Sequence, residues 1–359
     1  MIDFDLSTGL AQGPGKTTKN FEGIMSSIKT PLMALLLLAA CDGNSLITAV
    51  DPVVDPIPDP DGIHSEHALP PGTESPAPNT VIVRREAKDN TGNGYVEGVS
   101  YNADNDTFSV DGLAFDGGNV YHRGTSVASL GPTAVYEAAS SYSDDVTGAP
   151  IDQFSYRALY GVSTSGQTEF AIIRTGAYIP YGFGGFIYQR NGGVTLPTSG
   201  QAHYEGDYSG LRDFNGINGV EYATGDMTMD IDFNDFNQGN GVKGEVTNRA
   251  VLDANGNDVT NDILTALNAN LTNPLTELPT LTFTVGPGVM DANGEIAGAI
   301  GSYYTDGGAA VTYETGNYYA IVSGDAAEEV VGVIVVEGAD PRYTGVTVRE
   351  TGGFILYRE

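Results

Sequence analysis

The sequence predicts an all-β protein, with a β-rich N-terminal part followed by an eight-stranded antiparallel β-barrel and at most one or two short helices. Three observations lead to this class. The 359-residue chain contains 48 glycines and 20 tyrosines but only 16 lysines and arginines together, a composition that suits strands and tight turns. From residue 81 onward, short apolar runs are separated by clusters of Gly, Asn and Asp, which are typical of turns. In the second half, apolar and polar residues alternate with a period of two, as in a strand with one buried face.

The first 40 residues read as a leader. Residues 1–24 carry no apolar periodicity, so we interpret them as an upstream mis-start and Met25 as the true start. Residues 25–40 have a positive charge at Lys29 and then an apolar run too short to span a bilayer, which predicts a secretory signal peptide. The alternative interpretation of this run is a buried apolar helix.

The signal peptide ends directly before Cys41, the only cysteine of the chain. The run Leu38, Ala39, Ala40 and Cys41 resembles the lipobox of bacterial lipoproteins, in which the cysteine is lipidated and becomes the mature N-terminus. The resemblance implies that a lipid on Cys41 anchors the protein to a membrane without crossing it. We expect a surface-exposed lipoprotein of the outer membrane. The alternative is a periplasm-facing protein. It is suggested by Asp42, because an aspartate directly after the lipidated cysteine often accompanies retention at the inner membrane of enteric bacteria.

The charge balance limits the partners of the protein. The chain has 46 acidic residues against 16 basic ones, a formal net charge of −30. Nucleic acid is excluded as a partner, because its affinity comes largely from Lys and Arg side chains that release counterions. A single cysteine can neither close an intrachain disulfide nor build a Cys-based zinc site.

Proline and aspartate dominate residues 41–80, which predicts a semi-rigid tether behind the lipidated cysteine. Residues 81–190 are predicted to form a β-rich N-terminal domain, and residues 191–200 a linker. One segment of this domain, residues 133–142, has Ala, Glu and Tyr at helical spacing and is predicted as a short helix. The predicted strands are residues 80–84, 95–101, 107–115, 154–162, 169–179 and 184–190.

Residues 201–359 hold the predicted barrel. The clearest alternation is in residues 227–233, where every odd residue is apolar and every even one polar. A helix is expected at residues 261–268, with Asn261 as its N-cap. Eight strands suffice to close a small barrel that is filled by side chains and has no exposed sheet edge. The predicted strands are residues 202–210, 227–233, 241–250, 281–285, 295–303, 318–323, 330–337 and 351–357.

A pair of glycines before an aromatic strand occurs twice, as Gly184 and Gly185 before Phe186 and as Gly352 and Gly353 before Phe354. Each pair is placed in the closing strand of its domain, where strands pack closely. Coincidence explains the repeat equally well.

Four blocks in the second half resemble, in order, the barrel domain of the transferrin-binding protein B family. They are residues 196–206, residues 230–233 with 241–246, residues 294–298, and residues 326–333. The chain departs from the family at residues 318–325, where the family has a tight Gly-Pro turn, and at Val331, where a glycine is usual. The resemblance implies one lobe, with residues 81–190 as a handle domain, that binds a host iron protein or another macromolecule through loops of variable sequence.

No residues with an enzymatic pattern were found, so we predict neither an enzyme nor a cofactor. The sequence has no Gly-x-Ser-x-Gly elbow and no phosphate-binding loop. Its only imidazoles are His64, His67, His122 and His203, and the pair His64 and His67 lies in the predicted tether, where it is a weak metal signal. The Asx-rich segments 102–106 and 253–258 supply oxygen ligands suited to calcium but lack the EF-hand pattern, and hairpin turns explain them at least as well. We therefore predict no metal site.

The function predicted from these observations is binding. Tyr303, Tyr304, Tyr318 and Tyr319 lie beside glycine-rich turns, and tyrosine is a common interface residue. They are candidate ligand-binding residues for an extracellular protein or iron carrier, while the membrane is a partner only through the lipid. The alternative is that alternate tyrosines of each pair are barrel core. The second functional hypothesis is a structural or adhesive lipoprotein of an acidic surface coat.

Overall fold

The structure is a computed structural model that describes residues 68–359 apart from 178–180, 235–240 and 285–288. Cys41, His64, His67, the leader and residues 41–67 of the predicted tether lie outside the described residues. The described part of the chain contains no helix long and apolar enough to cross a membrane.

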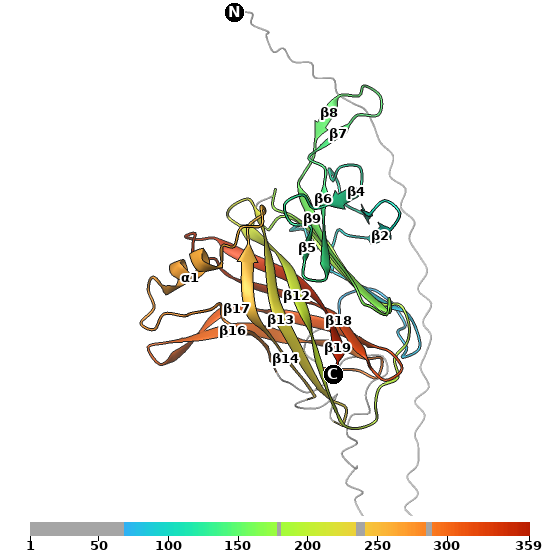
Figure 1. Ribbon diagram of the computed structural model, residues 1–359, viewed down its shortest axis with the longest axis vertical. Helices are drawn as coiled ribbons and strands as arrows, with labels where there is room; N and C mark the ends of the chain where they lie inside the picture. The colour runs from blue at the N-terminus through green and yellow to red at the C-terminus, as the bar shows by residue number, and fades with distance from the viewer. Residues whose placement is uncertain (1–67, 178–180, 235–240, 285–288) are drawn as a thin grey trace, which may run out of the picture. The chain divides into compact units, whose positions relative to one another are not determined.

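A nine-stranded antiparallel sheet forms the first half (Figure 1). The order of its strands is β1-β11-β10-β9-β6-β4-β3-β2, and β5 pairs with β6. Its strands are β1 (Ile82–Arg85), β2 (Gly98–Asn102), β3 (Thr107–Asp111), β4 (Val120–Arg123), β5 (Ser129–Leu130), β6 (Thr133–Ala138), β9 (Tyr156–Val162), β10 (Thr168–Thr175) and β11 (Phe183–Arg190). A separate hairpin joins β7 (Ser141–Ser143) to β8 (Pro150–Asp152).

The helix predicted at residues 133–142 is wrong, because this segment forms β6 and the start of β7. β6 pairs with both β4 and β9, and its Val135 and Tyr136 are buried in the sheet. β-branched and aromatic side chains fit such a pleated, buried surface, and tertiary packing here outweighs the local helical spacing. The six strands predicted in this half are present, whereas β4, β5, β7 and β8 were not predicted.

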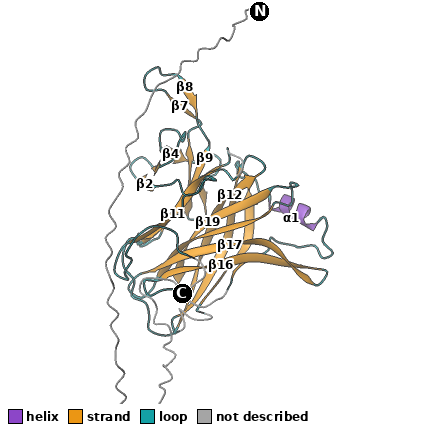
Figure 2. Ribbon diagram, turned by 180° about the vertical axis from the view of Figure 1, so that it is seen from behind, coloured by secondary structure: helices purple, strands orange, loops and turns teal. Residues whose placement is uncertain are grey.

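The second half is a closed antiparallel barrel of eight strands, as predicted (Figure 2). Each predicted strand is present, and several are longer than expected. The strands are β12 (Gln201–Asn215), β13 (Val220–Asp232), β14 (Val242–Leu252), β15 (Leu281–Phe283), β16 (Glu295–Asp306), β17 (Ala309–Ser323), β18 (Glu329–Ala339) and β19 (Thr347–Arg358). β12 pairs with both β13 and β19, which closes the barrel.

Side chains fill the barrel, and part of its outer wall is also buried. On β13 the predicted alternation holds, since Met227, Met229 and Ile231 point into the barrel core. On β18 it fails, because Val331 and Val333 lie in a second core that they share with residues of the sheet. A strand buried on both faces reads as a continuous apolar run, and this is how β18 reads.

One α-helix occurs among the described residues, α1 (Thr260–Asn268), close to the predicted range. Asn261 is not its N-cap, so that prediction is wrong. The N-cap position is Val259, which makes no side-chain capping bond. Thr260 instead accepts a hydrogen bond from the backbone N–H of Val251 on β14, which ties the start of the helix to the barrel wall.

Two buried arginines hold the sheet and the preceding segment to one end of the barrel. Arg84 forms a bidentate ion pair with Glu295 at the start of β16, at 2.6 and 2.8 Å. Arg190 donates to backbone carbonyls of the barrel, Asn293 and Val322, both at 2.8 Å. It also donates to carbonyls of the segment before β1, namely Ala77, Pro78 and Thr80. Residues 70–80 of the predicted tether are therefore fixed along β1. We call the barrel end that contains Glu295 and Ser323 the clamped end, and the opposite end, with turns 216–219 and 307–308, the free end.

Candidate functional site

A groove near the free end is the candidate binding site. It has a volume of about 500 Å³ and lies between residues 274–280 and residues 303–305; we call it the edge groove. Its lining combines proline, leucine and tyrosine side chains with one carboxylate, Glu277, and contains no Lys or Arg. Four threonines also line the groove, so its wall mixes apolar and polar side chains around two tyrosines.

The local sequence explains why the groove exists. β15 begins only at Leu281, opposite Ser302, so β16 continues toward the free end without a neighbour on that side. The β16–β17 hairpin projects past its neighbours, as Figures 1 and 2 show. Gly307 and Gly308 close this hairpin with φ values of +55° and +84°. Two such residues make a two-residue type I′ turn, which suits the twist of the strands.

The four predicted tyrosines do not form one site. Tyr303 and Tyr304 both line the edge groove, where Tyr303 is 53% exposed and Tyr304 is half-buried. Tyr318 is fully buried inside the barrel and stacks on Phe283 with ring centroids 3.6 Å apart. Burial raises the pKa of Tyr318, so its ring is neutral. Tyr318 belongs to the barrel core and is not available to an external ligand. This is the position that the alternative interpretation gave to one tyrosine of each pair.

Tyr319 lies on the outer face of the barrel, beneath the sheet. It packs against the core shared by the two parts and stacks with Phe186 of β11, with ring centroids 6.4 Å apart. Tyr318 and Tyr319 face opposite sides of one strand because side chains alternate along it. The glycine-rich context could not distinguish these positions from those of Tyr303 and Tyr304.

An ion cluster occupies the barrel interior near the free end. It consists of Arg212, Arg249, Arg342, Glu221, Glu314, Asp340 and Glu350, and we call it the interior ion cluster. Arg249 donates to Glu314 at 2.6 and 3.0 Å and to Glu350 at 3.1 Å. Burial by itself raises the pKa of Glu314, but the charge of Arg249 and the hydrogen bonds from Arg249 and Ser302 outweigh it and lower this pKa. The cluster fills the interior at the end where a ligand could otherwise enter.

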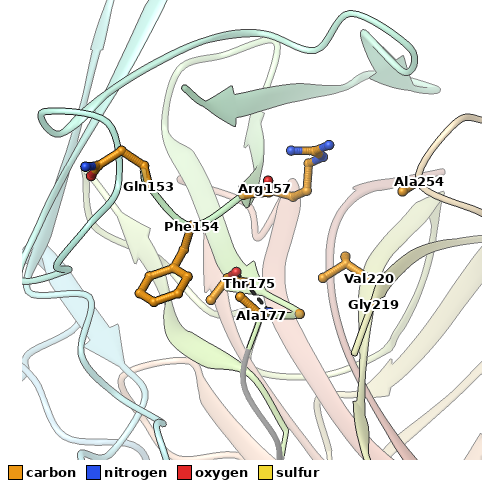
Figure 3. Close-up of a pocket in the computed structure, with 10 residues that line it drawn as sticks. Gln153, Phe154, Arg157, Thr175, Ala177, Gly219, Val220 and Ala254 are labelled. Atoms are coloured by element: carbon orange, nitrogen blue, oxygen red, sulfur yellow. Dashed lines mark hydrogen bonds between the residues drawn. The ribbon is translucent and has the colours of Figure 1, made fainter. Parts of the chain in front are cut away.

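A second cavity, of about 400 Å³, lies between the sheet and the barrel; we call it the junction pocket (Figure 3). The sheet contributes Phe154, Arg157 and Thr175, and the barrel contributes Val220 and Ala254. Arg157 lies 3.3 Å from Glu137, so its charge is already compensated.

The floor of the junction pocket is a close contact between two backbones. Gly219 donates to the carbonyl of Gly176 at 3.0 Å, and a Cβ on Gly176 would lie 2.1 Å from the oxygen of Gly219. No sequence signal predicted this pocket, because its two walls are more than 40 residues apart in the chain and neither contains a motif.

A third cavity, of about 730 Å³, lies at the clamped end beside His203. Nδ1 of His203 is 2.6 Å from Asp230, and Nε2 is 3.0 Å from Glu205. The hydrogen bonds that the ring nitrogens of His203 make to the carboxylates of Asp230 and then Glu205 raise the pKa of His203 and engage both nitrogens. His122 lies exposed on β4. Among the described residues, no three His, Cys, Asp or Glu side chains are grouped to hold a metal ion.

The two Asx-rich segments form turns, the alternative given for them above. Oδ1 of Asp253 accepts from the backbone N–H groups of Asn255 and Asn257. Oδ1 of Asn102 accepts from Asp104 in the same way. These oxygens stabilise hairpin loops.

Comparison with known proteins shows similarity only among solved structures. No protein-family model and no curated protein sequence matches the chain. A mutant of the vaccine antigen transferrin-binding protein B from Haemophilus parasuis Hp5 is 13% identical, with a TM-score of 0.36. The alignment covers 77% of this chain and 45% of that one. An intact transferrin-binding protein B with N and C lobes is 14% identical over 77% of this chain and 46% of that one, with a TM-score of 0.35.

A candidate outer membrane protein from Bacteroides fragilis NCTC 9343 is also similar. It is 12% identical, with a TM-score of 0.22, over 78% of this chain and 89% of that one. The chain thus spans about half the length of the transferrin-binding protein structures that it matches.

Proposed function

We propose that this chain is a non-enzymatic, lipid-anchored protein of the bacterial outer membrane that captures an extracellular protein or an iron-bearing ligand with the free end of its barrel. One observation carries the proposal. The last part of the predicted tether, residues 70–80, is fixed at the clamped end by Arg84 and Arg190, whereas Tyr303 and Tyr304 line a groove toward the opposite end. A lipid on Cys41 would then join the folded part through a segment that ends at the clamped end, which leaves the free end for a partner.

The filling of the barrel supports an external ligand. Barrels that carry small molecules keep an interior cavity, whereas apolar side chains and the interior ion cluster fill this one. The groove and the loops therefore offer the accessible binding surface at the free end.

The rigid support of these loops favours recognition. At the free end, Arg342 in the loop between β18 and β19 donates to Glu221 at 2.7 Å and to Asp340 at 2.6 Å. Loops on a scaffold that is already ordered lose less entropy on binding, which leaves more of the contact energy for affinity.

The second candidate function, an acidic structural or adhesive coat, is favoured by the outer charge. The described residues include 36 acidic and 13 basic side chains, of which nine acidic and six basic ones are buried. The remaining 27 acidic and seven basic side chains make the exterior strongly anionic, which keeps such a protein soluble and repels other anions.

The location is tested by treating intact cells with proteinase K and detecting the protein with an antibody. We expect cleavage of the wild type on whole cells and loss of cell-bound protein in Cys41→Ala. Protection until the outer membrane is opened would instead favour the periplasm-facing alternative and exclude a surface receptor.

Binding is tested with iron-loaded transferrin as the first probe, which the sequence resemblance suggests. We expect saturable binding that the double substitution Tyr303→Ser, Tyr304→Ser weakens about tenfold or more, because interface tyrosines carry a large share of the contact energy. His203→Gln at the clamped end is the matched control and leaves binding unchanged. Weak contacts that salt abolishes in every variant would favour the coat function.

A further inference from the structure

The edge groove contains a strand edge that no described residue pairs with. The backbone N–H of Thr284 donates to the carbonyl of Ala299, so Ala299 directs its polar groups toward β15. Alternate residues of a strand face the same neighbour, so Tyr303 and Thr305 face that side too. The two-residue turn leads to the same conclusion. Its closing pair, Asp306 and Ala309, forms hydrogen bonds within the hairpin, so the backbone N–H and C=O of Thr305 point away from β17.

Within the described residues, a neighbouring segment covers the equivalent edge of β14, whereas no backbone hydrogen bond covers Tyr303 or Thr305, and Thr272 donates only to Oδ1 of Asp306 at the end of the strand. On β14, Val259 donates to the carbonyl of Val251, and Val251 donates to Thr260, so the segment before α1 takes the place of a neighbouring strand. On β16, the ladder with β15 stops at Ser302. Pro279, two residues before the start of β15, has no N–H to donate. Residues 274–280 instead diverge from β16 and form the far wall of the groove.

Natural proteins usually protect such edges with lysine or with a covering segment. Neither protection is present here, since no Lys or Arg lines the groove. The charges around it are negative: Glu277 lies in the wall, and Asp306 lies at the end of the strand. The predicted tether, with Asp51, Asp55, Asp59 and Asp61 between its prolines, has the same sign of charge and is an unfavourable occupant.

We propose that the edge groove binds an extended, lysine- or arginine-bearing segment of a partner protein, which adds as a strand to β16 at Tyr303 and Thr305. The backbone of Tyr303 and Thr305 supplies the hydrogen bonds of strand addition. The tyrosine, leucine and proline side chains of the groove contact alternate side chains of the added strand, and the acidic rim selects its charge. This inference rests on the proposed function, because it names the class of segment that the free end captures.

The probe is a short synthetic peptide of alternating lysine and valine with a fluorescent label, titrated against the full-length protein. Two matched peptides accompany it, one with glutamate in place of lysine and one with alternate backbone amides N-methylated. We expect saturable binding of the lysine peptide. The other two peptides should bind at least about tenfold more weakly. The glutamate peptide loses charge complementarity, and the N-methylated peptide loses backbone hydrogen bonds.

Two proline variants test the position of the edge. Thr305→Pro removes an N–H that faces the groove, and we expect about tenfold weaker binding of the lysine peptide. Ala310→Pro is the matched control, because Ala310 lies directly across the hairpin from Thr305 and its N–H faces away from the groove. It leaves binding unchanged. Hydrogen exchange on the wild type gives a readout without substitution, since the amides of Tyr303 and Thr305 become protected when the peptide binds.

Three results would overturn strand addition: no binding of the lysine peptide, equal binding of its N-methylated form, or equal loss in both proline variants. The proposed function fails separately. If Tyr303→Ser weakens the capture of a macromolecule while N-methylation has no effect on peptide binding, the free end remains the binding face and only strand addition is wrong. If the peptides bind as expected but proteinase K does not cleave the protein on intact cells, strand addition at the groove is supported and the surface location is wrong.

Discussion

Arg190 is the residue on which the arrangement of the structure depends most. Its guanidinium is fully buried and bonds only to backbone carbonyls, from the segment before β1, the linker and the barrel. Burial lowers the pKa of Arg190 to about 10, which still leaves it charged at neutral pH. One side chain thus joins three parts of the chain that are more than 100 residues apart.

Replacing this side chain should destabilise the protein. Arg190→Met leaves several buried carbonyls without donors, so we expect the free energy of unfolding to fall by about 3 kcal/mol or more, measured by urea denaturation. Arg85→Met, on the exposed end of β1, is the control and should change it by less than about 0.5 kcal/mol. If both substitutions change the free energy of unfolding by a similarly small amount, the hydrogen bonds of Arg190 do not stabilise the fold.

Asp291 predicts a pH dependence. Burial raises the pKa of this carboxyl from 3.8 to about 7, although hydrogen bonds from Glu295 and Asn293 oppose the shift. Since the folded state holds the proton more tightly than the unfolded state, its contribution to stability is complete below pH 4 and is lost as the pH rises through 7. Between pH 4 and 8 the wild type should therefore lose more stability than Asp291→Asn. Equal pH dependence of the two unfolding midpoints would refute the assignment.

At the scale of the strand, the paired glycines of β19 have different partners. A Cβ on Gly352 would meet the ring of Tyr208 inside the barrel at 2.2 Å, and one on Gly353 would meet Phe170 of the sheet at 2.3 Å. The pair therefore makes room for an aromatic ring on each side of the barrel wall. In β11, Gly185 faces Val96 and Gly184 has a φ of +157°, so the repeated sequence serves a different packing there.

Gly353→Ala should push Phe170 away and loosen the sheet from the barrel. We expect a loss of about 1–3 kcal/mol in the free energy of unfolding, as for other overpacked cores. Gly98→Ala on β2 is the matched control, because its Cβ would approach nothing closer than 3.4 Å. If the two variants unfold alike, the close approach seen at Gly353 does not limit the packing.

The sequence predicted the elements better than the contacts between them. Period-two alternation is a local property, so the barrel strands could be read directly from it. β6 was mispredicted because its pairing with β4 and β9 decides its structure, and the cap of α1 because the bonds of Val259 and Thr260 to Val251 on β14 decide where the helix begins. The ion pair of Arg249 with Glu350 joins residues about 100 positions apart, and only barrel closure brings them together. The edge groove was found in part, through Tyr303 and Tyr304, but the early end of its neighbouring strand gave no signal.

At the scale of the whole molecule, the sheet and the barrel share a core. Phe170, Ile172 and Phe186 of the sheet pack with Leu211 and Val331 on the barrel wall. Because neither surface can be exposed without losing this core, we expect residues 81–359 to unfold in one transition. Calorimetry should give a single peak with equal calorimetric and van't Hoff enthalpies. Two peaks would mean that the sheet and the barrel are separate folding units.

The placement of the arginines and lysines also determines how susceptible the protein is to trypsin. Trypsin cuts only after Lys and Arg, and residues 42–83 contain neither. Beyond them, six of the 13 basic residues in the described part are buried, and Arg123, Arg157 and Arg342 are held in ion pairs. We expect trypsin to leave the folded protein largely intact at concentrations at which proteinase K cleaves within the predicted tether, as read by gel electrophoresis. If the protein lies on the cell surface as proposed, an enzyme of trypsin-like specificity would release almost none of it, and this acidic protein would persist where lysine-rich neighbours are removed.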